Sequence, residues 1–236
     1  MEFRPIITII IIINMQNIVL LTAAGHGERA EFKIPKQWQK IDGISITEYT
    51  LRKFLQIDKI DKILILYNKE NYSDAKKLLS INSKISILEG GNTAQETRDI
   101  GLRAINANID DNIIIHDAVR PLVSIDLIKR IIELSYLSAI VPIDKNRDTL
   151  FDIKNNKQIY SYNLVGTQTP QLFKFGLISN VFKKAKEENI FNSFYSPFEL
   201  LNYYNCEIHF IPGELLNFKI TYSEDIKIFK KLKDLG

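Results

Sequence analysis

A chain of 236 residues with a net charge of +3 is long enough for one large domain, or for a domain with a small projecting arm. Hydrophobic residues make up 45% and charged residues 25% of the sequence, as in ordinary globular proteins, and the weak positive charge excludes a basic nucleic-acid footprint. The single cysteine, Cys206, excludes a disulfide within the chain and a cysteine-histidine metal cluster, so we expect a cytoplasmic protein.

The first fourteen residues stand apart from the rest. Residues 6–13 form an apolar run that ends at Asn14, far short of the roughly 20 residues that a membrane-spanning helix needs. A secretory signal is not indicated, because no small-residue cleavage site follows before the next strand begins. Met15 directly precedes that strand, so we expect residues 1–14 to be an extension with no role. A genuine additional strand is the alternative.

From Asn17 onward, short apolar runs alternate with amphipathic segments. The apolar runs lack polar alternation, as strands covered on both faces do: 18–21, 62–67, 85–88, 112–115 and 139–141. Apolar residues recur at helical spacing between them: 47–55, 73–79, 96–105 and 127–134. The repetition predicts an α/β fold with a doubly wound, mostly parallel Rossmann-like sheet, whose ligands bind at the carboxyl ends of the strands.

The pattern changes between Asp144 and Gly166. Two short strand-like segments flank the pair Asn155-Asn156, which is typical of a hairpin without a helical partner. Because an isolated hairpin is marginal in water, we expect it to project from the domain as an arm and to pack on another surface, such as a second subunit. Beyond the arm the pattern indicates two helices, a strand and a closing helix: 177–186, 199–204, 208–211 and from 224 onward.

The strongest local signal is the loop after the first strand, AAGHGER at 23–29, followed by PKQ at 35–37. Glycines beside alanines let the backbone approach a ligand, and the amides of such a loop form an anion cradle. Arg29 and Lys36 add the cations that a triphosphate needs. The alternatives are a dinucleotide fingerprint and a purely structural turn. Pro35 opposes the fingerprint, because it falls where the helix of that motif would be in mid-course.

A second group of polar residues, HDAVRP at 116–121, follows the strand at 112–115. An acid and a cation at the carboxyl end of a strand occupy the place where an α/β site collects its chemistry. Taken alone, Asp117 and Arg120 are equally explained as a structural ion pair. Three weaker signals complete the set: GGN at 90–92 with Thr97, TQTPQ at 167–171, and NFKIT at 217–221.

In this order, the five motifs resemble those of the 2-C-methyl-D-erythritol 4-phosphate cytidylyltransferase family, in which we include the related ribitol 5-phosphate cytidylyltransferases. The resemblance extends from Asn17 to the C-terminus. It implies a fold of the nucleotide-diphospho-sugar transferase type, with residues 15–236 as one cytidylyltransferase domain. It also implies a homodimer in which each arm, residues 144–166, reaches over the site of the partner.

The resemblance further implies roles for individual residues. Nucleotide binding is assigned to seven positions: Ala23, Ala24, Gly25, Gly27, Gly91, Asn92 and Thr97. Catalysis by neutralising phosphate charge is assigned to three cations: Arg29, Lys36 and Lys219. Contact with the acceptor is assigned to four residues: Asp117, Arg120, Thr149 and Thr169. Mg²⁺ would bridge oxygens of CTP, with Asp117 as the protein ligand.

The chain departs from the family pattern mainly on the acceptor side. Ser161 stands on the arm where an arginine is usual, and residues 195–197 replace a segment that faces the acceptor. On the nucleotide side, Ala94 stands where a basic residue is common. Two residues are candidates to replace the missing arginine: Arg147 and Lys157. This asymmetry indicates an altered acceptor more than a loss of activity.

We therefore expect a cytidylyltransferase that transfers CMP from CTP to a phosphorylated polyol and releases diphosphate. The attacking phosphate oxygen is already an anion, so the reaction needs orientation and charge neutralisation more than a general base. The favoured acceptor is 2-C-methyl-D-erythritol 4-phosphate, and the alternative is ribitol 5-phosphate or another polyol phosphate of surface polysaccharide synthesis. A paralogue that binds CTP without turnover is the alternative of a different class. We expect no nucleic-acid or membrane partner.

Overall fold

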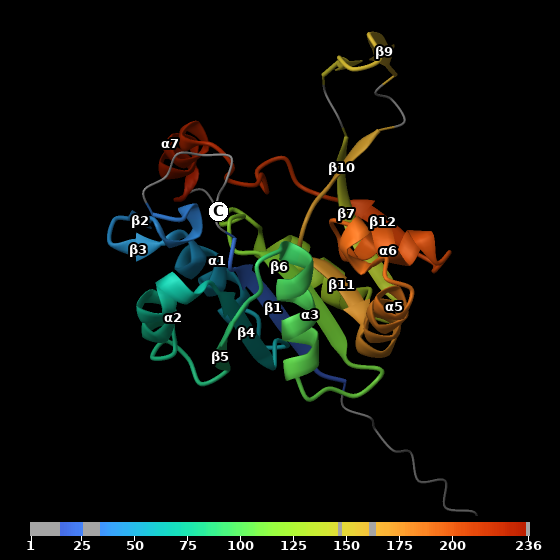
Figure 1. The fold of residues 1–236 in the computed structure, drawn as a ribbon. Coiled ribbons are helices and arrows are strands. Elements are labelled where there is room, and N and C mark those ends of the chain that lie inside the picture. The colour runs from blue at the N-terminus through green and yellow to red at the C-terminus, as the bar shows by residue number, and fades with distance from the viewer. Residues whose placement is uncertain (1–14, 26–33, 146–147, 161–163, 235–236) are drawn as a thin grey trace, which may run out of the picture.

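The computed structural model describes residues 15–25, 34–145, 148–160 and 164–234. Within these ranges a mixed, mostly parallel sheet forms the centre of the protein (Figure 1). Its strands are β1 (Asn17–Ala23), β4 (Lys62–Tyr67), β5 (Ile85–Glu89), β6 (Asn112–Asp117), β7 (Ala139–Lys145), β10 (Val165–Thr167), β11 (Gln171–Lys174) and β12 (His209–Pro212). They lie in the order β10-β7-β11-β6-β1-β4-β5, and β12 also pairs with β7.

The half of the sheet formed by β6, β1, β4 and β5 is parallel, which confirms the prediction from the apolar runs. β1 pairs in parallel with β4 and β6, and β4 pairs in parallel with β5. Residues 18–21 of β1 are completely buried, because helices cover both faces of the strand. The predicted strand 62–67 coincides with β4, and the predicted strand 208–211 is shifted by one residue to β12. The other predicted strands of the sheet are longer than expected by up to four residues.

β11 is a strand that the sequence analysis does not predict. It lies antiparallel between β6 and β7, with Leu172 opposite Ile114 on one side and Ile140 on the other. Its four residues follow Pro170 directly and lead straight into a helix. A segment this short has no periodicity of its own, so only its place in the sheet reveals it.

Helices cover both faces of the sheet. They are α1 (Ile46–Leu55), α2 (Tyr72–Leu78), α3 (Ala94–Ala104), α4 (Ile125–Glu133), α5 (Phe175–Glu187), α6 (Pro197–Tyr203) and α7 (Ser223–Leu232). Short 3₁₀ turns complete them: η1 (Lys36–Trp38), η2 (Lys69–Asn71) and η4 (Phe191–Ser193). None of the helices in the described ranges is both long and apolar enough to cross a membrane.

The core is divided into two layers by the sheet. On one face, Val19 and Leu21 of β1 pack with α1, α2 and α4. On the other face, Ile18 and Leu20 pack with α3, α5 and α6. Successive side chains of a strand point to opposite faces, so one apolar run supplies both layers. This arrangement confirms the doubly wound fold.

Polar side chains cap three of the helices: Ser45 caps α1, Thr93 caps α3 and Ser124 caps α4. The described helices begin one or two residues before the predicted ones. Thr93 illustrates the effect: its side chain accepts a hydrogen bond from the amide of Glu96, while Glu96 accepts one from the amide of Thr93. This capping box satisfies two amides that the helix itself cannot bond. It starts α3 at Ala94 rather than at the predicted residue 96.

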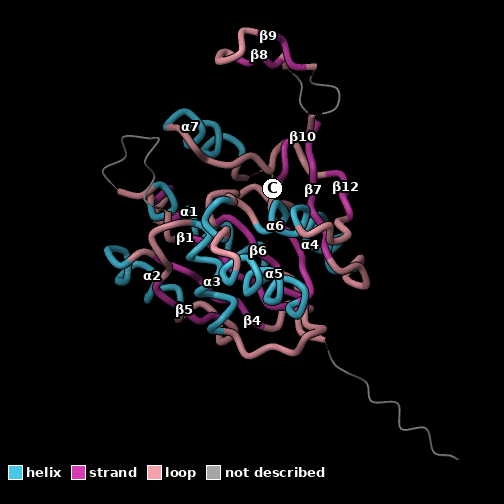
Figure 2. Tube along the Cα trace, turned by 45° about the vertical axis from the view of Figure 1, so that its right-hand side comes forward, coloured by secondary structure: helices cyan, strands magenta, loops and turns pink. Residues whose placement is uncertain are grey.

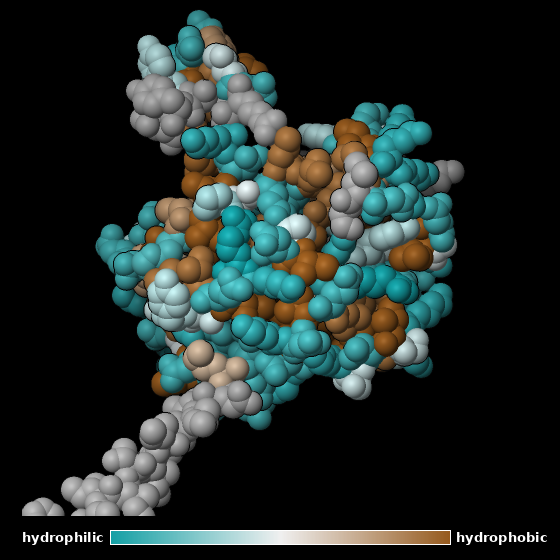
Figure 3. Space-filling model, turned by 180° about the vertical axis from the view of Figure 1, so that it is seen from behind, coloured by the Kyte–Doolittle hydropathy of each residue, from teal (hydrophilic) through white to brown (hydrophobic). Residues whose placement is uncertain are grey.

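The predicted arm is present and stands clear of the main body (Figures 2 and 3). β7 and β10 form an antiparallel ribbon, and beyond it β8 (Leu150–Asp152) and β9 (Lys157–Ile159) form a separate hairpin. Asn156 has a φ of 49° at the hairpin turn, a conformation that asparagine tolerates. Three apolar side chains of the arm are exposed by more than half: Phe151, Ile153 and Tyr160.

The C-terminal helix closes a small third cluster above the sheet. Ile226 and Phe229 of α7 pack with Ile41, Ile46 and Val119, among other apolar residues. Ile41 belongs to a small hairpin of β2 (Lys40–Ile41) and β3 (Ile44–Ser45) that precedes α1. The cluster matters for function because it anchors the segment before α7, which carries the NFKIT motif.

Candidate active site

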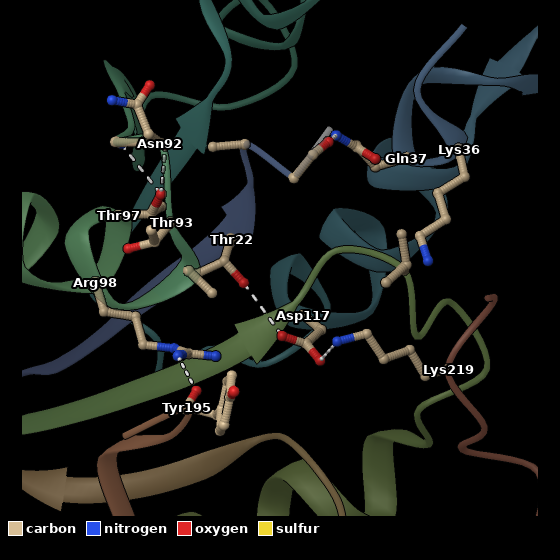
Figure 4. Close-up of a pocket in the computed structure, with 15 residues that line it drawn as sticks. Thr22, Lys36, Gln37, Asn92, Thr93, Thr97, Arg98, Asp117, Tyr195 and Lys219 are labelled. Carbon is tan, nitrogen blue, oxygen red and sulfur yellow. Dashed lines mark hydrogen bonds and ion pairs between the residues drawn. The ribbon is translucent and has the colours of Figure 1, made fainter. Parts of the chain in front are cut away.

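A cavity of about 430 Å³ opens at the carboxyl ends of β1, β5 and β6 (Figure 4). This is the edge at which an open α/β sheet binds its ligands. The described lining residues include four charged side chains: Lys36, Arg98, Asp117 and Lys219. Lys36 and Lys219 are 183 positions apart in the sequence, yet the fold brings them to the same cavity.

The loop after β1 is held in place by Gln37 of the PKQ motif. The buried Gln37 side chain donates hydrogen bonds to the carbonyls of Ala23 at 2.9 Å and Gly25 at 2.6 Å. Its own carbonyl accepts a hydrogen bond from Thr47 at 2.8 Å. Gln37 therefore ties the glycine loop to η1, and the neighbouring Lys36 points its Nζ into the cavity (Figure 4).

The loop after β5 packs directly against the loop after β1. A Cβ atom on Gly90 would lie 2.7 Å from the Cβ of Ala24, so a larger residue at position 90 would push the two loops apart. The Thr97 hydroxyl accepts a hydrogen bond from the amide of Gly91 at 3.1 Å. Thr97 is only 3% exposed, so its hydroxyl shapes the loop from within. Gly91 and Asn92 are thereby presented to the cavity.

Asp117 lies at the centre of the charge in the cavity. Its Oδ2 is 2.9 Å from Nζ of Lys219 and 3.7 Å from Nε of Arg120, and its Oδ1 accepts a hydrogen bond from Thr22 at 3.3 Å. Burial alone would raise the pKa of Asp117, but the positive charges of Lys219, Arg120 and Arg98 outweigh it and hold the pKa well below the usual range. Asp117 is therefore ionised at neutral pH.

The backbone of Asp117 is fixed by a buried hydrogen-bond relay through His116 and Thr169. Nε2 of His116 faces the carbonyl of Arg120 at 3.3 Å and so carries the proton, which leaves Nδ1 to accept from the Thr169 hydroxyl at 3.0 Å. The Thr169 oxygen in turn accepts from the amide of Asp117 at 3.1 Å. Burial lowers the pKa of His116 to about 3, so the ring is neutral and serves as scaffold.

The NFKIT and TQTPQ motifs hold each other and so position Lys219. The completely buried Asn217 donates to the carbonyl of Thr169 at 2.8 Å and to the side chain of Gln168 at 3.1 Å. The Asn217 carbonyl accepts from Arg120 at 2.7 Å. Lys219, two residues later, is half-exposed and reaches Asp117. Most residues of these motifs therefore hold the backbone in place, and Lys219 is the residue that they direct into the cavity.

Arg98 is a lining residue that the sequence analysis misses. It lies in the second turn of α3, directly after Thr97, and is 8% exposed. A signal was available, because Arg98 precedes the buried Leu102 by four residues and so falls on the core-facing side of an amphipathic helix. An arginine there requires an explanation other than packing.

The structure sorts the predicted site residues into three groups. Eight line the cavity: Ala24, Gly25, Lys36, Gly91, Asn92, Thr97, Asp117 and Lys219. Four others are described but are not among its lining residues: Ala23 in β1, Arg120 and Thr169 behind Asp117, and Thr149 on the arm. The roles assigned to both groups stay predictions. The third group lies outside the described ranges: Gly27 and Arg29 of the site, residues 1–14, and Arg147 and Ser161 of the arm.

Comparison with known proteins agrees with this geometry. The family model described as IspD, 2-C-methyl-D-erythritol 4-phosphate cytidylyltransferase, matches residues 17–231. The protein of that name from Clostridium botulinum is 34% identical over 218 residues, which are 89% of this chain and 95% of that protein. The crystal structure of 4-diphosphocytidyl-2C-methyl-D-erythritol synthase from Anaerococcus prevotii has the same fold, with a TM-score of 0.80 over 94% of this chain and 99% of that one, at 23% identity.

Some relatives are longer than this chain. The bifunctional enzyme IspD/IspF of Wolbachia pipientis is 32% identical over 222 residues, which are 90% of this chain and 54% of that enzyme. The chain thus spans about half the length of such bifunctional relatives and almost the full length of the Clostridium protein. The match covers the sheet, the cavity and the arm alike. This chain belongs to the 2-C-methyl-D-erythritol 4-phosphate cytidylyltransferase family.

Proposed function

We propose that this protein transfers CMP from CTP to 2-C-methyl-D-erythritol 4-phosphate and releases diphosphate. The observation that carries the proposal is the meeting of Lys36, Asp117 and Lys219 beside two glycine loops in one cavity. Membership of the family supports the choice of nucleotide and acceptor. Nucleotidyl transfer is chemistry for which the cavity is suited, because it offers fixed amides and cations rather than a nucleophilic side chain.

The nucleotide would lie along the two loops that Gln37 and Thr97 hold. Gly91 and Asn92 would face the cytosine and ribose, while Ala24, Gly25 and Lys36 would face the triphosphate. Among the described residues, no side chain within 4 Å fills the space beside Gly25 into which a Cβ would project, which would let a phosphate approach the backbone closely there. The loops are preorganised by buried hydrogen bonds, which reduces the entropy that binding has to remove.

In the reaction, a phosphate oxygen of the acceptor forms a bond to the α-phosphorus of CTP while the bond to the bridging oxygen of the diphosphate breaks. Lys36 would neutralise charge on the leaving side, and Lys219 would meet the five-coordinate phosphorus. Oδ2 of Asp117 lies 2.9 Å from Nζ of Lys219 in the absence of substrate. This ion pair keeps the Lys219 amino group in the cavity instead of in bulk solvent. No proton has to be removed from a phosphate dianion.

The donor set in the cavity fits Mg²⁺ carried by the nucleotide. Asp117 is the carboxylate among the described lining residues, and no cluster of three or more metal-binding side chains occurs in the part of the chain that the structure describes. Mg²⁺ is commonly held by phosphate oxygens with only one or two carboxylates. Asp117 would hold it from the protein side, and the ion would neutralise charge on the triphosphate.

The remaining partners are also part of the proposal. The exposed apolar residues Phe151, Ile153 and Tyr160 support a second copy of the chain as the surface on which the arm packs. Thr149, at the base of the hairpin, would then contact the acceptor of that copy. The cytoplasmic location remains a prediction from the sequence.

One experiment tests the activity. The protein is incubated with CTP, Mg²⁺ and one of several acceptors: 2-C-methyl-D-erythritol 4-phosphate, ribitol 5-phosphate and glycerol 3-phosphate. Diphosphate release and the mass of the cytidylated product are measured, with unphosphorylated methylerythritol as the control. Methylerythritol phosphate should give the highest kcat/KM. Faster turnover of ribitol phosphate would contradict the proposed acceptor, and CTP binding without diphosphate release from any acceptor would contradict the enzyme.

A further inference from the structure

Arg98 is a buried cation in the wall of the active-site cavity. Its guanidinium is directed toward the space beside Asp117 (Figure 4). Nη1 donates to the carbonyl of Tyr195 at 2.9 Å and to the side-chain oxygen of Gln95 at 3.3 Å. Both acceptors are neutral, and the buried Nε has no hydrogen-bond partner among the described residues. The guanidinium thus keeps its full charge while only part of its donor capacity is used.

No carboxylate of the described residues forms an ion pair with Arg98 within 4.0 Å, although Asp117 is its neighbour in the cavity. Oδ2 of Asp117 is already engaged by Lys219 at 2.9 Å. Burial lowers the pKa of Arg98, and the charges of Asp117 and Glu199 oppose this only in part. A buried arginine without a close counter-ion costs free energy in the empty protein. Such a group is explained when an anionic ligand completes the site.

Arg98 also lies in a particular place relative to the other cations. In Figure 4, Lys36 and Arg98 occupy opposite sides of the cavity, and Asp117 lies between them with the amino group of Lys219 beside it. In-line displacement requires the entering oxygen and the leaving diphosphate to lie on opposite sides of the reacting phosphorus. With Lys36 and the glycine loop at the leaving group, the opposite side belongs to the acceptor.

We propose that Arg98 binds the phosphate of the acceptor and holds its attacking oxygen opposite the leaving diphosphate. This inference rests on the proposed function and adds a residue to it that lies in the same chain as the nucleotide loops. Arg98 also fixes the neighbouring wall, because the carbonyl that it bonds belongs to Tyr195, another lining residue. The amide of Tyr195 is bonded to Glu199 at 2.8 Å, so this wall is tied at two points.

The test replaces Arg98 with methionine, which keeps length and buried area but removes the charge. For Arg98→Met we expect the KM for methylerythritol phosphate to rise about 10- to 100-fold, the effect of losing charged hydrogen bonds. The KM for CTP should stay within about threefold. The melting temperature should change little, because the relief of a buried cation's desolvation is offset by loss of its hydrogen bond to the Tyr195 carbonyl. Arg98→Lys should recover part of the acceptor affinity, since it restores the charge without the planar fork.

A matched control is available on the same helix. Arg103 of α3 is exposed and pairs with Asp99 at 3.0 Å outside the cavity, so Arg103→Gln should leave both KM values unchanged. An equal rise of both KM values in Arg98→Met, or a lower melting temperature with unchanged KM values, would overturn the assignment of Arg98 to the acceptor.

The acceptor panel separates failure of this inference from failure of the proposed function. If the wild-type protein uses another polyol phosphate instead of methylerythritol phosphate, the proposed acceptor is wrong, and Arg98 is judged on the KM for the acceptor that reacts. If methylerythritol phosphate reacts but its KM does not depend on Arg98, only the role of Arg98 is wrong. If no member of the panel binds or reacts, both are wrong.

Discussion

The two glycine loops of the cavity and the projecting arm are built in opposite ways. The loops are locked by buried hydrogen bonds from Gln37 and Thr97 and are packed against each other at Gly90 and Ala24. In the arm, Ile153 is 88% exposed. Among the described residues of the arm, β7 pairs with β10 and β8 pairs with β9. The difference teaches that the described loops of the cavity are held in place by contacts within one chain. The arm, in contrast, has an apolar surface that a single copy leaves uncovered.

The largest effect should come from the loop side of this comparison. Lys36→Ala removes a cation from the end of the cavity proposed to bind the triphosphate, and kcat should fall on the order of 10²–10³-fold. Steady-state diphosphate release measures it. Lys40→Ala is the control, because Lys40 is exposed and faces Asp74 at 3.9 Å outside the cavity. Turnover of the Lys36 variant within a few-fold of wild type would remove Lys36 from the mechanism.

The next effect concerns the scaffold behind Asp117. The pKa of His116 is about 3 in the folded protein and near 6.5 when unfolded, so only the unfolded chain takes up this proton between those values. The contribution to stability is complete above pH 6.5 and is lost as the pH falls toward 3, by at most about 1.4 kcal/mol per pH unit. Denaturant unfolding from pH 7 to 4 should therefore show a shallower pH dependence in His116→Gln than in wild type.

The control for His116 is His209→Gln, because His209 is partly exposed on β12 and remote from the relay. This variant should keep the wild-type slope. Equal slopes in wild type and His116→Gln would mean that His116 is not buried as a neutral ring.

Ile153→Asp tests the arm, and we expect it to have the smallest effect on the stability of the fold. Ile153 touches little of its own chain, so the free energy of unfolding of the domain should change by no more than about 0.5 kcal/mol. If the arm packs on a second copy, sedimentation over a concentration series should show weaker self-association. Tyr136→Asp, a similar change at a residue 74% exposed on the main body, should leave self-association as it is. Unaltered sedimentation of the Ile153 variant would exclude this residue from an interface.

Much of the framework could be predicted because its signals are local. The strand at 62–67 is a continuous apolar run, and the hairpin turn at Asn155-Asn156 has its own residue preference. β11 could not be predicted, because four residues between a proline and a helix carry no period. Its assignment depends on hydrogen bonds to β6 and β7, which are properties of the folded sheet.

The candidate site shows the same limit in finer detail. Lys36, Asp117 and Lys219 could be predicted because they belong to the motifs that carry the family resemblance, and Asp117 also lies at the end of a predicted strand. The sequence does not say which motif residues touch the ligand: Gln37 and Asn217 hold the backbone, while Thr169 supports Asp117 from behind. Arg98 was missed because it belongs to no motif. The proposal that Arg98 binds an anion depends on the absence of a close counter-ion among the described residues, which only the three-dimensional structure shows.

Only a few residues of the chain connect the arm to Asp117, and this has a consequence for activity. β10 ends at Thr167, and Thr169, only two residues later, already bonds the amide of Asp117. Few residues therefore separate the arm, which would contact a neighbouring subunit, from Asp117, which forms the ion pair with Lys219. A displacement of the arm would therefore act directly on the residue that holds the backbone of Asp117. We expect the specific activity to fall on dilution in parallel with dissociation of the proposed dimer. The arm would then couple activity to the oligomeric state.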